Sequence, residues 1–163
     1  MNIFESQEEY ELQGHMDFQG LMIDIENKKG TYRTGVDPNG KPWRTFMYCP
    51  YGRIRHTSTN SDGEELDVYI GENKESDKVY QIEQMKSPDF EEFDEYKYML
   101  GFDNMGEAVE AYLKQYNDAG FLGTVREIPF KDFKEKIDEY ISRNHTKPEV
   151  NEIFSKWSHI ISR

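Results

Sequence analysis

A cluster of carboxylates lies near the middle of the chain, where residues 62–67 read Asp-Gly-Glu-Glu-Leu-Asp. On a regular strand Asp62 and Glu64 face one way and Asp67 faces the other, so the three converge only if the chain bends, which Gly63 permits. Converging carboxylates repel one another unless a cation neutralises them. Because Mg²⁺ accepts a few carboxylates and keeps waters and phosphate oxygens in its shell, the cluster indicates metal-assisted phosphoryl chemistry. A solvated turn can have the same composition, and that alternative stays open at this point.

A second group combines acids with a lysine in the segment 93–97, Phe-Asp-Glu-Tyr-Lys, with Asp89 upstream. Carboxylates for a metal and an ammonium for a phosphate are complementary requirements of phosphoryl chemistry. The alternative is an ordinary exposed run of charges. An EF-hand loop is excluded, because aligning Gly63 with the glycine of that loop puts Tyr69 where its bidentate glutamate belongs. The glycine-rich phosphate-binding motifs are also missing from the sequence.

Charge and cysteine content narrow the class of protein. The 163 residues, with 32 acidic and 20 basic side chains and a net charge of -12, suit a single folded domain. This charge repels phosphate backbones and anionic lipid heads, so we expect neither nucleic acid nor a membrane as a partner. Cys49 is the lone cysteine, which excludes an internal disulfide and suits a reducing cytoplasm. The sequence also leads us to expect no export signal and no membrane-spanning segment.

Hydrophobic periodicity predicts a β-rich first half and a second half with helices. Alternation predicts strands over 19–26, 67–70, 79–85 and 123–128, with short strands and tight turns over 27–50. Helical spacing predicts one helix after Asn104, with Glu107 completing a capping box, and two more over 130–141 and 148–161. This layout places the chain in the α+β class.

Both charged segments resemble motifs of the soluble, metal-dependent family I inorganic pyrophosphatases. That family has Tyr-Gly-Tyr-Ile-x-x-Thr and then Asp-Gly-Asp-Pro-x-Asp-Val, where this chain reads Tyr-Gly-Arg-Ile-Arg-His-Thr at 51–57 and Asp-Gly-Glu-Glu-Leu-Asp-Val at 62–68. The segment 93–102 is similar to the Phe-Asp-Glu-x-Lys-x-Met-Leu-Gly-Phe run of the pyrophosphatase-like domains of phages and mobile elements, which is the nearer match. The resemblance covers the core at 18–142 and leaves the helix expected at 148–161 outside.

The resemblance implies a set of metal ligands and reacting groups. Glu64 would stand where the family has its general base or bridging carboxylate, although the family uses an aspartate, which is one methylene shorter. Tyr51 opens the Tyr-Gly motif and is assigned to the catalytic group together with Asp67. The implied metal ligands are Glu26, Asp62, Asp67 and either Asp94 or Glu95, with Asp89 as a weaker candidate.

The resemblance also implies phosphate contacts. Asn117 replaces a phosphate-binding lysine of the family, and Lys114 is a candidate substitute. The implied substrate-binding residues are Arg33, Lys97, Tyr116 and either Lys41 or Arg44.

The expected fold is a small five-stranded OB-like β-barrel with flanking helices and an extra C-terminal helix. The expected activity is hydrolysis of inorganic pyrophosphate to phosphate by a water activated by two or more Mg²⁺ ions, with Mn²⁺ as an alternative, in the cytoplasm of the host if a phage encodes the chain. A related alternative is a hydrolase of another small phosphoanhydride. Glu64 and Asn117 also keep open a catalytically weak or inactive binding or structural module of a phage or mobile element. Assembly into a homo-oligomer is left open.

Overall fold

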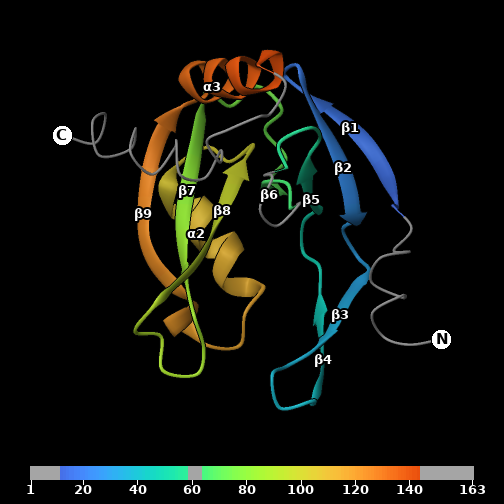
Figure 1. Cartoon of the computed structure of the whole chain (residues 1–163), viewed down its shortest axis with the longest axis vertical. Coiled ribbons are helices and arrows are strands. Elements are labelled where there is room, and N and C mark those ends of the chain that lie inside the picture. Colours follow the sequence, from blue (N-terminus) through green and yellow to red (C-terminus); the bar gives the residue numbers. More distant parts are fainter. Residues whose placement is uncertain (1–11, 59–63, 144–163) are drawn as a thin grey trace.

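Residues 12–58 and 64–143 are described in the computed structural model (Figure 1). The strands are β1 (Gly14–Phe18), β2 (Leu21–Asn27), β3 (Tyr32–Val36), β4 (Pro42–Phe46), β5 (Tyr51–Ile54), β6 (Asp67–Ile70), β7 (Lys78–Met85), β8 (Phe93–Leu100) and β9 (Leu122–Pro129). The helices are α2 (Met105–Lys114), the short 3-10 helix η1 (Ala119–Phe121) and α3 (Phe130–Ser142).

Seven strands form one sheet in the order β1-β2-β5-β6-β8-β7-β9, and β3 and β4 form a separate hairpin. Neighbouring strands of the large sheet are antiparallel except for β6 and β8, which are parallel. Figure 1 shows β1 and β9 on opposite sides of the molecule, and within the described residues they do not pair to close a barrel. The predicted α+β class is confirmed. The expected five-stranded OB-like barrel is not, because β1 and β9 extend the sheet at its two edges.

The two faces of the sheet bury separate apolar clusters, because side chains alternate along each strand. On one face Phe133 and Ile137 of α3 pack against residues that include Val68. On the other face Ala108 and Tyr112 of α2 pack with residues of β5, β6, β7 and β8. The carboxylates and cations described below lie at the end of this second cluster.

Local sequence accounts for the beginning of α2. The side chain of Asn104 accepts a hydrogen bond from the backbone N–H of Glu107 at 2.9 Å, and its amide nitrogen donates to the Glu107 carboxylate at 3.2 Å. The first of these bonds satisfies one of the backbone N–H groups that a helix start leaves unpaired, and the second joins the two side chains. The predicted N-cap at Asn104 is therefore confirmed, while the return bond of a capping box runs to the Asn104 side chain and not to its backbone N–H.

Strand β2 begins two residues later than the sequence predicts. Gln19 and Gly20 have φ values of 49° and 94°, which belong to a turn and interrupt the alternation. The Asp17 carboxylate accepts from the backbone N–H of Gly20 at 2.8 Å and holds that turn.

The helix expected at 148–161 lies outside the described residues. In the described part of the chain, no helix is long and apolar enough to cross a membrane.

Candidate active site

Strand register aligns polar side chains in a row across one face of the sheet. Asp24 of β2 pairs with His15 of β1 on one side and with Arg53 of β5 on the other, and Arg53 pairs with Asp67 of β6. Directly opposed residues of neighbouring strands point to the same face. The parallel pairing of β6 with β8 then brings Lys97 next to Asp67. The row therefore runs through the middle of the sheet and combines residues from five strands.

Lys97 lies at the β8 end of this row and makes several polar contacts. Its side chain is 4% exposed, and its ammonium donates to the Tyr51 hydroxyl, to Asp67 Oδ2 and to Glu95 Oε1, each at 2.9 Å. Burial alone would lower the pKa of Lys97, but the oxygens of Tyr51 and Asp67 outweigh burial and raise it. An ammonium has three hydrogens to donate, so these three contacts account for all of them.

The carboxyl groups of Asp67 and Glu95, which both contact Lys97, are joined by a hydrogen bond. Burial raises the pKa of Glu95 to about 7, with the Lys97 charge opposing this shift and Asp67 adding to it. Burial also acts to raise the pKa of Asp67, but Lys97 and the hydrogen bond from Glu95 outweigh it and lower that pKa. One proton shared between neighbouring carboxylates at neutral pH marks a site that suits a cation.

The structure brings Glu95 to Lys97 and does not bring Asp94 there. Gln84 pairs with Glu95 and Met85 pairs with Phe93, so Asp94 is the extra residue of a β-bulge, and its side chain is exposed. Glu95 and Lys97 lie on one face because they are two residues apart on β8. Sequence left the choice between Asp94 and Glu95 open, and the geometry favours Glu95.

A second bulge positions Glu26. Ile25 pairs with Gly52 and Asn27 pairs with Tyr51, so Glu26 is the extra residue of the bulge in β2. Burial raises the pKa of Glu26, and the charge of nearby Asp67 raises it further. Glu26 therefore adds a further carboxylate near Asp67.

Arg33 and Tyr116 reach the same site from β3 and from the segment after α2. The Arg33 guanidinium lies 4.6 Å from the centre of the Tyr51 ring and 5.4 Å from that of Trp43. The Tyr116 hydroxyl shares a hydrogen bond of 2.9 Å with the hydroxyl of Tyr69. Burial raises the pKa of Tyr51, so its hydroxyl stays protonated while it accepts from Lys97.

Lys41 and Arg44 lie elsewhere on the β3–β4 hairpin. Arg44 pairs with Thr34 and therefore faces away from Arg33, and its guanidinium lies 4.2 Å from the centre of the exposed Tyr32 ring. Lys41 is exposed in the turn, where its backbone N–H donates to Asp37. The structure thus brings neither of the two alternatives to Lys97.

The remaining candidates are also exposed. Asp89 accepts from the backbone N–H of Glu91 in the β7–β8 loop, and Lys114 forms a 3.6 Å ion pair with Glu110 on the surface of α2. Glu64 is exposed at the edge of the described chain. Asp62 lies outside the described residues.

Three residues that the sequence analysis passed over hold the site together. The Thr57 hydroxyl donates to the Ile54 carbonyl at 2.6 Å and accepts from the Leu66 N–H at 3.0 Å, so it joins the two ends of the segment that carries the acids. Gly52 lies so close to the Asp24 carbonyl that a Cβ would overlap it, which explains the glycine after Tyr51. Arg53 points to the same face as Asp67. All three residues belong to the motif at 51–57. The sequence analysis used that motif as a whole and assigned no role to these three residues.

The donor chemistry fits a hard cation, although the described residues do not form a complete site. Carboxylate oxygens of Glu26, Asp67 and Glu95 are ligands that Mg²⁺ prefers. Among the described residues, however, no group of three acidic, histidine or cysteine side chains is arranged to hold a metal ion. The Lys97 ammonium forms ion pairs with Asp67 and Glu95 and acts as their counter-ion.

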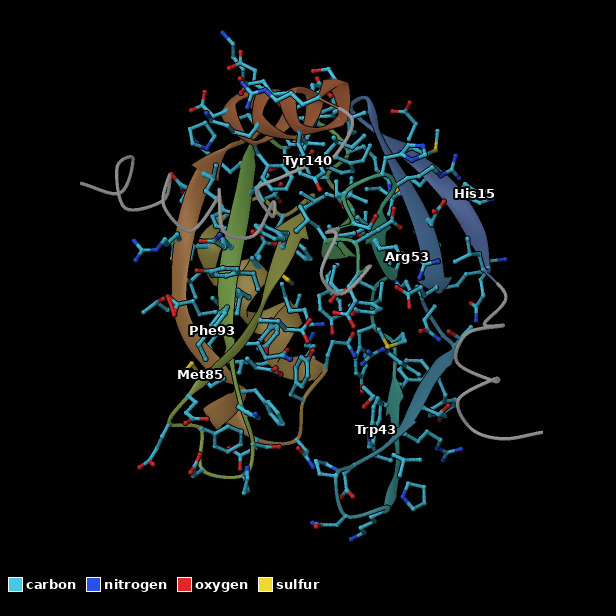
Figure 2. All side chains as sticks on the ribbon, in the orientation of Figure 1. His15, Trp43, Arg53, Met85, Phe93 and Tyr140 are labelled. Carbon is cyan, nitrogen blue, oxygen red and sulfur yellow. The ribbon has the colours of Figure 1, made fainter. Side chains whose placement is uncertain are left out.

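A cavity of about 300 Å³ lies beside α2 and is separate from this site. Its lining includes Tyr48, Glu72, Phe102 and Lys114 but none of the carboxylates on Lys97. The chemistry of the row, and not the size of the cavity, identifies the candidate site. Figure 2 shows Arg53 and Trp43 on the same half of the molecule, with Phe93 of β8 on the opposite half.

Comparison with models of protein families gives a match to the one described as Inorganic Pyrophosphatase, over residues 3–138. Comparisons with curated proteins and with solved structures give no match.

Proposed function

Because the chain belongs to the inorganic pyrophosphatase family, we propose that it hydrolyses inorganic pyrophosphate to two phosphates with the help of Mg²⁺. One observation carries the proposal beyond family membership. Tyr51 of β5, Asp67 of β6 and the pair Glu95 and Lys97 of β8 meet in a partly buried cluster of opposite charges. Such clusters of charge with shifted pKa values are concentrated at functional sites.

The metal would be held by carboxylates from three segments of the chain. Asp67 and Glu95 are the central ligands, Glu26 is placed beside them, and Asp62 completes the set from outside the described residues. A bound divalent cation acidifies a coordinated water and neutralises charge on the phosphate oxygens. Mn²⁺ offers the same oxygen-preferring chemistry and is the natural alternative.

The other residues bind and orient the substrate. Arg33 keeps its charge at any relevant pH and presents a planar fork of donors that suits a phosphoryl group. The hydroxyls of Tyr51 and Tyr116 donate to phosphate oxygens. Lys97 holds Asp67 and Glu95 at a fixed separation, and it contacts phosphate when a cation takes over those carboxylates. Glu64 accepts a proton from the attacking water.

Release of phosphate from pyrophosphate tests the proposal, measured with and without Mg²⁺. We expect Mg²⁺-dependent release by the wild-type protein and a loss of about 100-fold or more in Asp67→Asn, since even the groups that orient metal ligands contribute about 10–100-fold. Glu95→Gln is expected to lose activity and Asp94→Asn to keep it, because only Glu95 contacts Lys97. Retained folding of each variant is checked by circular dichroism.

The outcome separates the proposal from its alternatives. Activity on nucleoside triphosphates but not on pyrophosphate would indicate another small phosphoanhydride as substrate. A folded wild-type protein that releases no phosphate with Mg²⁺ or Mn²⁺ contradicts the hydrolase and leaves the binding or structural module. The cytoplasm, where pyrophosphate and Mg²⁺ are both available, is the proposed location.

A further inference from the structure

Arg53 occupies a central position in the polar row that the sequence did not assign to any role. It pairs with Asp67 on β6 and with Asp24 on β2, so its side chain leaves the sheet on the same face as Lys97. It is also close enough to Glu26 for its charge to act on that carboxylate. The pyrophosphatase motif that the chain resembles has a tyrosine at this position, so the arginine adds a cation to the site.

Asp24, the register neighbour of Arg53, already has another cation. Arg55 lies two residues further along the chain, just after the end of β5, and its guanidinium donates to Asp24 Oδ1 at 2.6 Å. His15 adds a contact to the same carboxylate oxygen at 2.9 Å. Because Asp24 is neutralised in this way, Arg53 is not needed as its counter-ion.

Most donors of Arg53 are unused within the described part of the chain. Its Nε lies 3.2 Å from Glu65 Oε1, which makes an ion pair. The two groups are not aligned well enough for a hydrogen bond. Nε is therefore buried without a hydrogen-bond partner among the described residues. The side chain as a whole is 40% exposed, so its guanidinium is accessible to a ligand. An arginine that is held by one misaligned carboxylate retains a fork of donors for an anion.

Without a bound metal, Lys97 has no hydrogen left to donate, so a phosphate anion at this site gains from another cation. Its three hydrogens are directed to Tyr51, Asp67 and Glu95. Arg33, the other cation that the structure brings to the site, lies over the Tyr51 ring. A substrate with two phosphoryl groups presents more oxygens than one guanidinium can pair.

We propose that Arg53 is a substrate-binding residue that donates a bidentate pair of hydrogen bonds to one phosphoryl group of the pyrophosphate. This inference rests on the proposed function, because it names a further contact of the same site. Arg53 and Arg33 then hold the two phosphoryl groups from neighbouring elements, β5 and β3. The planar fork is essential to this role, so a lysine replaces it only in part.

Binding of imidodiphosphate, an analogue that resists hydrolysis, tests the inference separately from turnover. Titration calorimetry in buffer with Mg²⁺ is expected to show about 10–100-fold weaker binding for Arg53→Gln, because hydrogen bonds to charged groups contribute about 1.5–3 kcal/mol. Arg53→Lys is expected to fall between the two. Arg143→Gln, at the exposed end of α3, changes the net charge equally and is expected to bind as the wild type does.

Steady-state kinetics gives a second readout, in which Arg53→Gln raises the KM for pyrophosphate more than it lowers kcat. Binding by Arg53→Gln within about twofold of the wild type would overturn the inference. Absence of analogue binding by the folded wild type would overturn it as well. If the wild type binds the analogue through Arg53 but hydrolyses nothing, the inference stands and the proposed hydrolase fails.

Discussion

Replacement of Lys97 by methionine is expected to destabilise the metal-free protein by about 3 kcal/mol. The Lys97 side chain is 4% exposed and pairs with both Asp67 and Glu95 at 2.9 Å. Methionine keeps the length and the apolar stem but removes the charge, so two neighbouring carboxylates lose their counter-ion. Loss of one partner of a buried ion pair costs about 3–5 kcal/mol. The lower end of this range applies, because Glu95 is 38% exposed and water screens part of the repulsion.

Urea unfolding followed by circular dichroism measures this difference, in EDTA so that no divalent cation replaces the lysine. Lys78→Met is the matched control, since Lys78 lies on β7 of the same sheet and pairs with Glu127 at 4.0 Å on the surface. Its loss is expected to be below about 1 kcal/mol. If the Lys97 and Lys78 variants coincide, and both lie within about 1 kcal/mol of the wild type, then Lys97 does not compensate the carboxylates and the reasoning is refuted.

A double variant locates the origin of the loss. With Glu95→Gln in the background, Lys97→Met removes a cation that has only Asp67 to neutralise. The penalty is therefore expected to shrink, with a coupling energy of about 1 kcal/mol or more between the two positions. Additive losses would mean that Lys97 does not compensate the charge of Glu95.

Two further predictions concern the same sheet. Gly52→Ala is expected to lower the unfolding free energy by about 3 kcal/mol, because the added Cβ overlaps the Asp24 carbonyl. The control Gly14→Ala, whose Cβ meets nothing within 4 Å, is expected to change the unfolding free energy by less than about 0.5 kcal/mol. Equal stabilities of the two variants in urea would contradict the close approach of β2 and β5. The pKa of Glu95 is raised to about 7 from its ordinary 4.5, so the folded carboxyl keeps a proton that the unfolded one releases, and the stability of the metal-free protein falls as pH rises through this interval. The Glu95→Gln side chain cannot titrate, so this variant should flatten the dependence of the unfolding free energy on pH. An unchanged slope would mean that other groups cause the pH dependence.

Local sequence was sufficient to predict those elements that have a regular pattern. The N-cap at Asn104 and the four-residue strand at Asp67–Ile70 were confirmed. β8 was missed as a strand because its first residues are charged, and a run such as 93–97 is typical of a loop. Glu95 and Lys97 interrupt the usual apolar alternation because they face a polar site inside the sheet, and such a site depends on strands that are distant in sequence.

The candidate site was predictable in composition but not in geometry. Sequence placed Asp67 and Lys97 in one site, and the structure joins them. The choice between Asp94 and Glu95 depends on a bulge whose register is set by Met85 and Gln84 of the neighbouring strand, so the segment alone could not decide it. Arg53 was overlooked for a related reason. The proposed role of Arg53 follows from the pairing of β5 with β6, which puts Arg53 opposite Asp67, and the spacing of the motif does not reveal this pairing.

The charges of the site indicate how its ligands depend on one another. Without a metal, Lys97 is fully occupied by Asp67, Glu95 and Tyr51, and the carboxylates share a proton. Under the proposed function, a cation bound by the carboxylate oxygens would displace that proton and leave the lysine hydrogens for phosphate. Substrate bound to Lys97 would in turn leave the carboxylates without their counter-ion and would strengthen their affinity for a cation. The same side chains would therefore couple metal binding to substrate binding, and such a coupling is reciprocal by thermodynamic necessity.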